Sequence, residues 1–370
     1  MAHIAAILGA LWIAIVLWDT FETVVLPRSV TRKLRLTRIF TITFGKVYIG
    51  IISKLFGPSR RSGFLNSFGP LLLLMLLGFW AISLITGFAF IQWGLGSVLV
   101  DQGVKRHAGV GTHLYMSGTT FFTLGYGDVT PVTPVSRVVA VTEAGLGLGY
   151  LALVIGYLPV LYQSFSRREA GISLLDARAG SPPTAVELVC RHAKAKSMGT
   201  LADLLRTMEV WSADLLESHL SYPVLAYYRS QHDRESWLAA LAAILDACAL
   251  IEQGFEGDPV WQHQLCWQAH LTFAMARHTI VDLGLVFGVS PLPVGEARMT
   301  PEHWEQVQRR LRDAGIPLAH PSYSRLAEIR AQYEPYIVAM AKRLLQDLPP
   351  FVEEQASLDN WETGWDSSHL

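Results

Sequence analysis

Residues 119–131 read Thr-Thr-Phe-Phe-Thr-Leu-Gly-Tyr-Gly-Asp-Val-Thr-Pro, and this stretch decides how the rest of the sequence is interpreted. Two glycines, Gly125 and Gly127, are separated by a single residue. Glycine adopts left-handed backbone angles without a steric penalty, so alternate residues here can turn consecutive carbonyl groups toward one axis. A lone Gly-x-Gly occurs by chance in many chains. This one follows an aromatic, Thr-containing segment and lies between two apolar runs, and that combination is specific.

The core of the stretch, Thr-Leu-Gly-Tyr-Gly-Asp, resembles the selectivity filter of prokaryotic potassium channels with one pore loop per chain, a two-transmembrane pore-domain ion channel family. The resemblance covers about residues 69–165. It implies that backbone carbonyls replace the water around K⁺, with a threonine hydroxyl as the innermost ring. The filter residues that it implies are Thr123, Leu124, Gly125, Tyr126, Gly127 and Asp128, with K⁺ held at Thr123, Leu124, Gly125 and Tyr126.

The sequence departs from the family pattern at several positions. Leu124 stands where Val or Ile is commonest, but its carbonyl is the working atom, so we expect little effect on selectivity. Several relatives carry a Glu four residues before the filter Thr, paired with the filter Asp, and Trp residues nearby. Those places hold Thr119, Tyr115 and Met116 here. Asp128 therefore lacks the usual carboxylate partner, which leaves the inactivation behaviour open.

Composition indicates a membrane protein with a polar domain. Of 370 residues, 51% are hydrophobic and only 16% are charged, which is too apolar for an ordinary soluble protein. The net charge of −1 gives no argument for nucleic-acid binding. Three widely spaced cysteines are expected to be reduced, buried thiols facing a cytosol. The first apolar run lacks a basic n-region and a clear cleavage site, so we expect a retained span and not a signal peptide.

The predicted fold class is an all-α membrane protein. Its pore module would consist of an outer helix over residues 70–95, a turret loop near 96–111, a pore helix near 112–123, the filter, and an inner helix over 135–163. The filter Asp faces outward in such channels. Basic residues before the outer helix and after the inner helix agree with a cytoplasmic side there.

Residues 4–26 form an additional N-terminal span, and a basic cluster follows it. We expect this cluster on the cytoplasmic side in contact with anionic lipid, with a solvated positive-inside cluster as the alternative. Asp19 and Glu22 are expected to meet it at the inner boundary. The regular arginine spacing resembles that of a voltage sensor, but it lies in a polar stretch and the chain is short of the spans that a sensor requires, so we favour lipid contact over voltage sensing. The cluster consists of Arg28, Arg32, Lys33, Arg35 and Arg38.

Residues 39–57 are apolar but contain Lys46 and Lys54. We favour an amphipathic helix on the cytoplasmic membrane surface over a fourth span, because a span would move the basic cluster to the outer face.

The inner helix contains small residues that lack the leading Thr and closing Asp of a filter. They allow close helix packing, and a proline late in the span predicts a kink at which the helix could gate. A packing adjustment without a gate is the alternative. The gating candidates are Gly145, Gly147, Gly149, Gly156 and Pro159.

The remainder of the chain predicts an all-helical cytoplasmic C-terminal domain. Residues 236–251 are almost entirely apolar and should be buried in a bundle. Neither a nucleotide-binding unit nor a cyclic-nucleotide β-roll is visible. The predicted domains are an N-terminal transmembrane helix (1–26), a basic linker with an interfacial helix (27–68), the pore domain (69–165), a linker (166–183), a cytoplasmic helical domain (184–348) and an acidic tail (349–370).

One cluster in this domain has metal-ligand spacing. His263, Cys266 and His270 share a helix face and could bind zinc, although interleaved aromatic residues favour core packing. We expect no cofactor. The absence of a nucleophile–base–orienter arrangement argues against an enzyme.

The sequence therefore predicts a homotetramer in the plasma membrane that conducts K⁺ passively and is gated or assembled by its cytoplasmic helices. A subunit of a potassium uptake system and a membrane sensor with a non-conducting pore are the alternatives. The gating stimulus, and whether the cytoplasmic helices bind a ligand, stay open.

Overall fold

The structure is a computed structural model that forms two compact units, residues 1–163 and 164–370. The residues that it describes are 2–26, 35–57, 63–96, 98–101, 104–107, 109–230, 235–256, 259–292 and 298–352.

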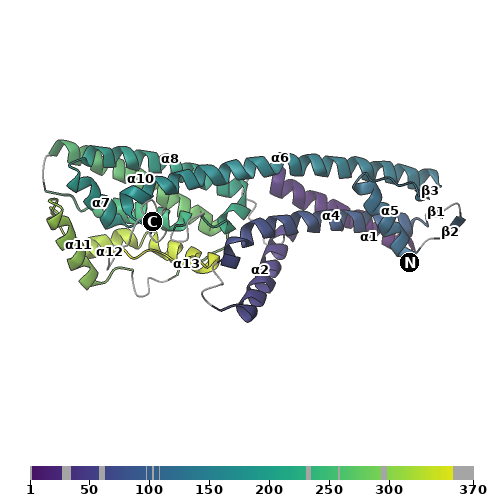
Figure 1. The fold of residues 1–370 in the computed structure, drawn as a ribbon, viewed down its shortest axis with the longest axis horizontal. Coiled ribbons are helices and arrows are strands. Elements are labelled where there is room, and N and C mark those ends of the chain that lie inside the picture. The colour runs from purple at the N-terminus through teal and green to yellow at the C-terminus, as the bar shows by residue number, and fades with distance from the viewer. Residues whose placement is uncertain are drawn as a thin grey trace, which may run out of the picture. The chain divides into compact units, whose positions relative to one another are not determined.

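The first unit is built from long apolar helices and a small sheet (Figure 1). Among its described residues, four helices are long and apolar enough to cross a membrane, including the beginning of α6. The elements are α1 (Ala2–Thr20), continued by the π-helical turn η1 (Phe21–Val25), α2 (Leu36–Leu55), α4 (Phe68–Gly94), β1 (Val98–Asp101), β2 (Val104–His107), α5 (Val110–Phe121), β3 (Val129–Pro131) and α6 (Pro134–Ala179).

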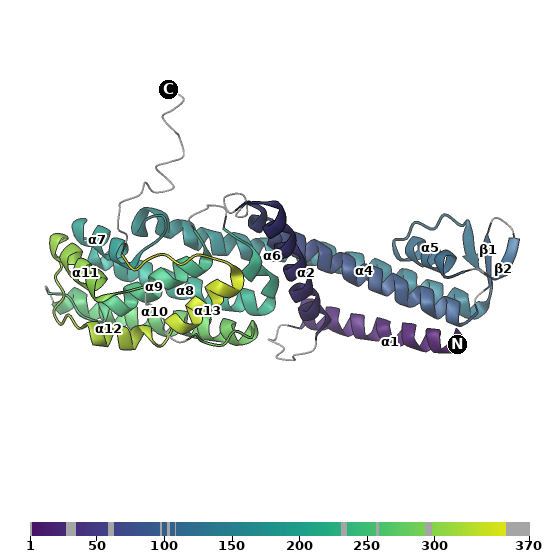
Figure 2. The ribbon, with the colours of Figure 1, turned by 90° about the horizontal axis from the view of Figure 1, so that it is seen from below.

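Helices α1 and α4 run antiparallel and side by side (Figures 1 and 2). Two glycines make this close packing feasible. A Cβ on Gly9 would lie 2.6 Å from the carbonyl oxygen of Gly87, and a Cβ on Gly87 would lie 2.5 Å from Cγ1 of Ile13. In the absence of side chains at both positions, the two backbones approach each other directly.

Helix α2 has a different orientation from α1 and α4. In both views it runs across these helices instead of alongside them (Figures 1 and 2). Stacked rings hold it against α4: the centroids of Phe40 and Phe79 are 4.9 Å apart, and those of Phe44 and Phe68 are 6.0 Å apart. The remaining faces of α2 are largely exposed.

The expected turret loop is a β-hairpin instead. Strands β1 and β2 are antiparallel, and β1 also pairs with β3, so the strand order is β2-β1-β3. Leu99 lies opposite Pro131, and Asp101 lies opposite Val129. The segment directly after the filter is thereby tied to the segment that follows α4.

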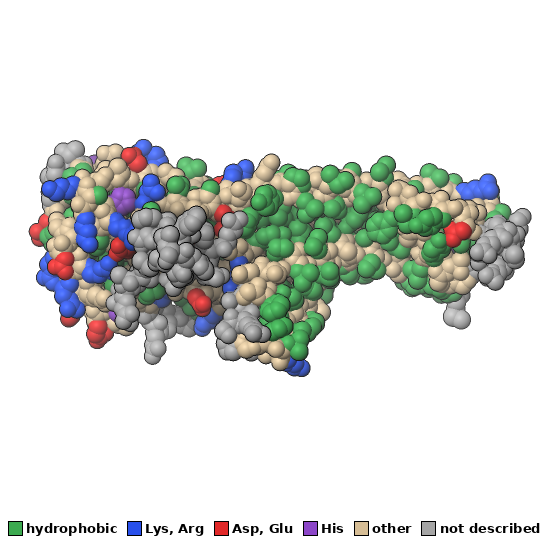
Figure 3. Space-filling view, in the orientation of Figure 1, with side chains coloured by type: hydrophobic (Ala, Val, Ile, Leu, Met, Phe, Trp, Pro, Cys, Tyr) green, Lys and Arg blue, Asp and Glu red, His purple; other side chains and the backbone are tan. Residues whose placement is uncertain are grey.

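Helix α6 is longer than the sequence predicts. It continues through Pro159 to Ala179, so the proline does not end it. Residues 166–179 of the expected linker are therefore helical, and the second compact unit begins at Ser164. Hydrophobic side chains gather in broad patches on the visible surface over α2, α4 and the first part of α6 (Figure 3).

The second unit is a helical bundle around α9, whose side chains are all buried. This confirms the prediction for residues 236–251. Ser236 caps the helix by accepting a 3.0 Å hydrogen bond from the Ala239 amide, and Thr300 similarly caps α11. The elements are α7 (Ala185–Lys194), α8 (Met198–Ser221), η2 (Pro223–Tyr227), α9 (Trp237–Ile251), α10 (Pro259–Val286), α11 (Pro301–Asp313), α12 (Tyr323–Arg330) and α13 (Glu334–Leu344).

Asp246 is a buried acid within the otherwise apolar α9. Its Oδ1 accepts a 2.6 Å hydrogen bond from the Tyr333 hydroxyl, and its Oδ2 lies 2.9 Å from Nη2 of Arg298. A buried carboxylate is tolerated only with such partners, so this network is structural.

The first residues of the expected acidic tail belong to the helical domain. Phe351 and Val352 are buried in the core of the second unit, which corrects the predicted boundary at residue 349. Residues 353–370 lie outside the described part of the chain.

Candidate functional site: the loop after the pore helix

The backbone of the predicted filter alternates in handedness. Thr123, Gly125 and Gly127 have φ angles of +56°, +56° and +76°. This confirms the expectation that alternate residues adopt left-handed angles and that the two glycines accommodate two of them. Thr123 carries a Cβ, so its left-handed conformation costs about 1–2 kcal/mol, which the surrounding contacts must offset.

The amide groups at the start of this loop point back to α5. The amides of Leu124 and Gly125 donate to the carbonyl oxygen of Thr119 at 2.8 and 3.4 Å. In a planar trans peptide the N–H and the preceding C=O point in opposite directions. The carbonyls of Thr123 and Leu124 therefore point away from α5, toward the open side of the loop.

The C-terminal end of α5 lies directly behind these groups. Helix dipoles place partial negative charge at a C-terminus, where cations are favoured. Helix and loop together present carbonyl oxygens and a negative potential on one side. That is an arrangement suited to a dehydrated monovalent cation.

Asp128 has a hydrogen-bond partner that sequence reasoning missed. The Tyr115 hydroxyl donates to Oδ2 of Asp128 at 2.7 Å. A phenol on α5 thus stands where the resemblance to potassium channels leads one to expect a carboxylate partner for Asp128. Tyr115 lies about two turns before the end of α5, on the face toward Asp128. A phenol at this position on the helix that leads into the loop was the signal that could have identified the partner.

The loop is an uncovered surface on the single chain. Residues 122–128 are all exposed, and Leu124 and Tyr126 keep 56% and 69% of their surface accessible. The same holds for part of α6, where exposed apolar side chains recur every seven residues. They are Val141, Leu148, Ile155 and Tyr162.

The gating candidates separate into two groups. Gly147 is buried, and a Cβ there would lie 2.1 Å from the carbonyl oxygen of Phe121, so α6 packs tightly beneath the end of α5. The other four candidates are exposed: Gly145, Gly149, Gly156 and Pro159.

Sequence reasoning also missed Glu143, an acid within the apolar span 135–163. It is completely buried on α6, and its Oε1 lies in close contact with Oγ of Ser117 on α5. A lone carboxyl group in an otherwise uncharged stretch was the available signal.

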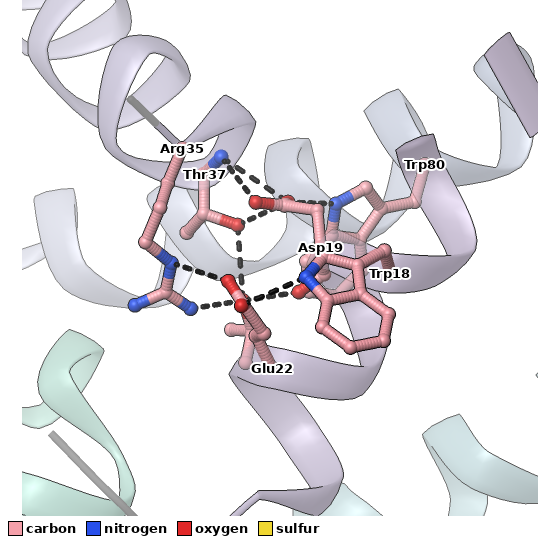
Figure 4. Close-up of polar contacts among 7 residues, drawn as sticks. Trp18, Asp19, Glu22, Arg35, Thr37 and Trp80 are labelled. Atoms are coloured by element: carbon pink, nitrogen blue, oxygen red, sulfur yellow. Dashed lines mark hydrogen bonds and ion pairs between the residues drawn. The ribbon is translucent and has the colours of Figure 1, made fainter. Parts of the chain in front are cut away.

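A second polar cluster joins α1, α2 and α4 (Figure 4). Oδ2 of Asp19 accepts hydrogen bonds from the Thr37 hydroxyl at 2.6 Å and from Nε1 of Trp80 at 3.0 Å. Both Asp19 carboxylate oxygens also lie 3.2 Å from the Thr37 amide, so Asp19 caps the N-terminus of α2 from a different helix.

The predicted contact between acids and the basic cluster is confirmed for one arginine. Nε of Arg35 lies 3.6 Å from Oε2 of Glu22, and Nη2 of Arg35 donates to the Thr23 hydroxyl at 3.0 Å. Arg38 is exposed. The other members of the cluster, Arg28, Arg32 and Lys33, lie outside the described residues.

The zinc interpretation is wrong. In the described part of the chain, no three His, Cys, Asp or Glu side chains are grouped to hold a metal ion. Sγ of Cys266 lies 3.8 Å from the Ile251 carbonyl, and Nδ1 of His270 lies 3.7 Å from Glu252, while His263 is exposed. A shared helix face did not bring the three side chains together, because Cys266 packs against α9.

Comparison with known proteins supports an ion-channel segment in a membrane protein. Residues 71–163 match a protein family described as "Ion channel". The chain is also similar to an uncharacterized membrane protein, YdjJ, of Bacillus subtilis (strain 168), with 28% identity over 191 residues. That alignment covers 51% of this chain and 55% of the relative, so the chain spans about half the length of the curated relative that it matches. No solved structure gives a significant match.

Proposed function

We propose that this chain is the subunit of a potassium-selective channel. The observation that carries the proposal is the alternating left-handed backbone at Thr123, Gly125 and Gly127. It turns the carbonyls of Thr123 and Leu124 away from the pore helix, and the family match over residues 71–163 supports the same reading. In the proposed pore, K⁺ is held at Thr123, Leu124, Gly125 and Tyr126, with Gly127 and Asp128 at the outer mouth.

One loop per chain supplies only part of a ring of carbonyls around an ion, so we infer a homotetramer. The exposed loop and the exposed apolar seam on α6 support this assembly, because neighbouring subunits would cover both. Inner helices with apolar residues every seven positions pack well against one another. Gly145, Gly149, Gly156 and Pro159 would then face the pore or a neighbouring subunit.

The proposed orientation places α1, α4 and α6 across the plasma membrane, with the amino terminus outside and the C-terminal unit in the cytoplasm. Helix α2 would lie on the inner membrane surface, which its crossing orientation supports (Figure 2). Exposed Arg38 would contact anionic lipid there, together with Arg28, Arg32 and Lys33. Arg35 would contribute less, since Glu22 already neutralises it.

We further infer that the C-terminal helical unit assembles or gates the pore. Helix α6 supports this inference, because its residues up to 163 belong to the first unit and its residues from Ser164 onward belong to the C-terminal unit.

The test is cation flux from liposomes containing the full-length protein, together with its mass in membrane nanodiscs. We expect a tetramer that releases K⁺ at least tenfold faster than Na⁺. Gly125→Ala should abolish this flux, since an L-residue at its φ of +56° is strained by about 1–2 kcal/mol in each subunit.

Gly118→Ala is the matched control. Gly118 lies in α5, and an added Cβ there would meet nothing within 4 Å, so flux should persist. A tetramer without flux would favour a non-conducting sensor. Flux that appears only with added partner subunits would favour an uptake system.

A further inference from the structure

Glu143 joins three helices around the pore helix. Oγ of Ser117 on α5 lies 2.7 Å from the carbonyl oxygen of Ile85 on α4 and in close contact with Oε1 of Glu143 on α6. Ser117 and Glu143 are both completely inaccessible to solvent in the single chain. A neighbouring subunit therefore cannot reach either group.

The number of hydrogens decides the charge of Glu143. A serine hydroxyl has one hydrogen to donate, and a backbone carbonyl can only accept. If Ser117 donates to Ile85, its contact with Glu143 is a hydrogen bond only when the carboxyl group itself donates. If Glu143 is ionised, Ser117 must donate to it, and two oxygens 2.7 Å apart would face each other without a hydrogen between them. Only the protonated acid satisfies both contacts.

The second carboxyl oxygen agrees with this assignment. Oε2 of Glu143 is buried and accepts no hydrogen bond, and among the described residues Glu143 forms no ion pair with a basic side chain. Burying an ionised carboxylate with a bare oxygen is far more costly than burying the neutral acid.

The position of Ser117 connects this bridge to the proposed filter. Two residues further along α5, the Thr119 carbonyl receives the amides of Leu124 and Gly125. One turn after Glu143, Gly147 packs against the Phe121 carbonyl. Residues one turn apart on α6 thus hold the same end of α5, one by a hydrogen bond and the other by close packing.

We propose that Glu143 is protonated at neutral pH and is a positioning residue, which fixes the pore helix between α4 and α6 and thereby holds the loop at residues 123–128. The role in conduction rests on the proposed channel function. The protonation state does not.

The experiment compares wild type, Glu143→Gln and Glu143→Ala as full-length proteins in liposomes. Infrared difference spectra measure the C=O absorption of protonated carboxyl groups, and flux assays measure the ratio of K⁺ to Na⁺ release. We expect the wild type minus Glu143→Gln spectrum to contain a protonated-carboxyl band at neutral pH. Gln supplies a neutral donor of the same shape, so its flux ratio should stay within about twofold of wild type, whereas that of Glu143→Ala should fall at least tenfold.

Absence of the band would overturn the proposal, as would a Glu143→Gln flux ratio as low as that of Glu143→Ala. Thermal unfolding of each variant distinguishes a displaced filter from a protein that fails to fold. If wild type carries no cation flux but the infrared band is present, the channel function fails and the protonated bridge stands.

Discussion

The Tyr115 hydroxyl donates a 2.7 Å hydrogen bond to Oδ2 of Asp128, across the boundary between the pore helix and the loop that follows it. Asp128 therefore has a partner that carries no charge of its own. A carboxylate partner would have to share a proton with Asp128, whereas the Tyr115 hydroxyl carries a proton of its own to donate. The orientation of Asp128 should depend on this single contact.

Tyr115→Phe removes the hydroxyl and keeps the ring. We expect K⁺ currents that decay several-fold faster during sustained activity, because Asp128 loses the donor that holds it. Single-channel or macroscopic recording in planar bilayers measures the decay. Gly118→Ala is a suitable control on the same helix, since an added Cβ there meets nothing within 4 Å. Equal acceleration in both variants would mean that the Tyr115 contact has no specific role.

Gly147→Ala should displace the pore helix. The new Cβ would lie 2.1 Å from the Phe121 carbonyl oxygen, and overpacking of this kind costs about 1–3 kcal/mol. We expect a lower thermal unfolding temperature and increased Na⁺ leakage.

Gly145→Ala and Gly149→Ala provide the matched comparison on the same helix. An added Cβ at either position meets nothing within 4 Å in the single chain. If these variants lose as much stability as Gly147→Ala, the tight contact with Phe121 is not what distinguishes Gly147.

The sequence predicts the local features of this region and misses the contacts between distant segments. Glycine spacing predicted the left-handed positions, because that constraint acts within one residue. It could not identify the Trp80 indole as a donor to Asp19, because 61 residues separate them and only the packing of α1 on α4 joins them. Glu143 is visible as an acid in an apolar run, but its partner Ser117 is fixed by how α5 fits between two helices.

The turret illustrates the same limit. Residues 96–111 contain too short an alternating pattern to predict strands. The pairing of β1 with β2, and of β1 with β3 beyond the filter, makes these residues strands. The end of the helical core was similarly missed, because Phe351 and Val352 lie in a sequence that is otherwise acidic and polar.

Asp19→Asn should loosen α2. The substitution removes the charge and one of two oxygens that accept from Thr37 at the N-terminus of α2. Hydrogen bonds to charged groups contribute about 1.5–3 kcal/mol, so amide hydrogen exchange in the first turns of α2 should accelerate roughly tenfold or more. Mass spectrometry of the protein in nanodiscs measures this exchange.

Thr41→Ala serves as the control on α2, because its hydroxyl bonds only to the Thr37 carbonyl within the same helix. Its exchange should match wild type. Unchanged exchange in Asp19→Asn would show that the aromatic contacts with α4 hold α2 without the carboxylate.

His219 should make the second unit less stable in mild acid. It is completely buried on α8, and burial together with the nearby Arg168 guanidinium lowers its pKa to about 3. In the unfolded chain the imidazole has its ordinary pKa near 6.5 and binds a proton at pH 5.5, while the folded protein does not. Stability from this group is present above pH 6.5 and is lost progressively as the pH falls toward 3.

Between pH 7.5 and pH 5.5 this difference amounts to about 1 kcal/mol. Calorimetric unfolding of the full-length protein should show a smaller decrease over that range in His219→Gln than in wild type. His263→Gln alters an exposed histidine and should show the same dependence of unfolding stability on pH as wild type. An identical loss of stability with falling pH in all three proteins would exclude His219 as the source of that loss.

The direct contact between the backbones of Gly9 and Gly87 makes α1 part of the wall around the pore module instead of a detachable anchor. This contact lies in the half of the α1–α4 pair that is nearer to α5 and the strands (Figures 1 and 2). Where α1 covers α4, lipid tails meet α1 instead. We therefore expect changes in bilayer thickness or lateral tension to act first on α1 and to reach the loop through the rigid pair of helices, so that the surrounding membrane becomes a mechanical input to the pore.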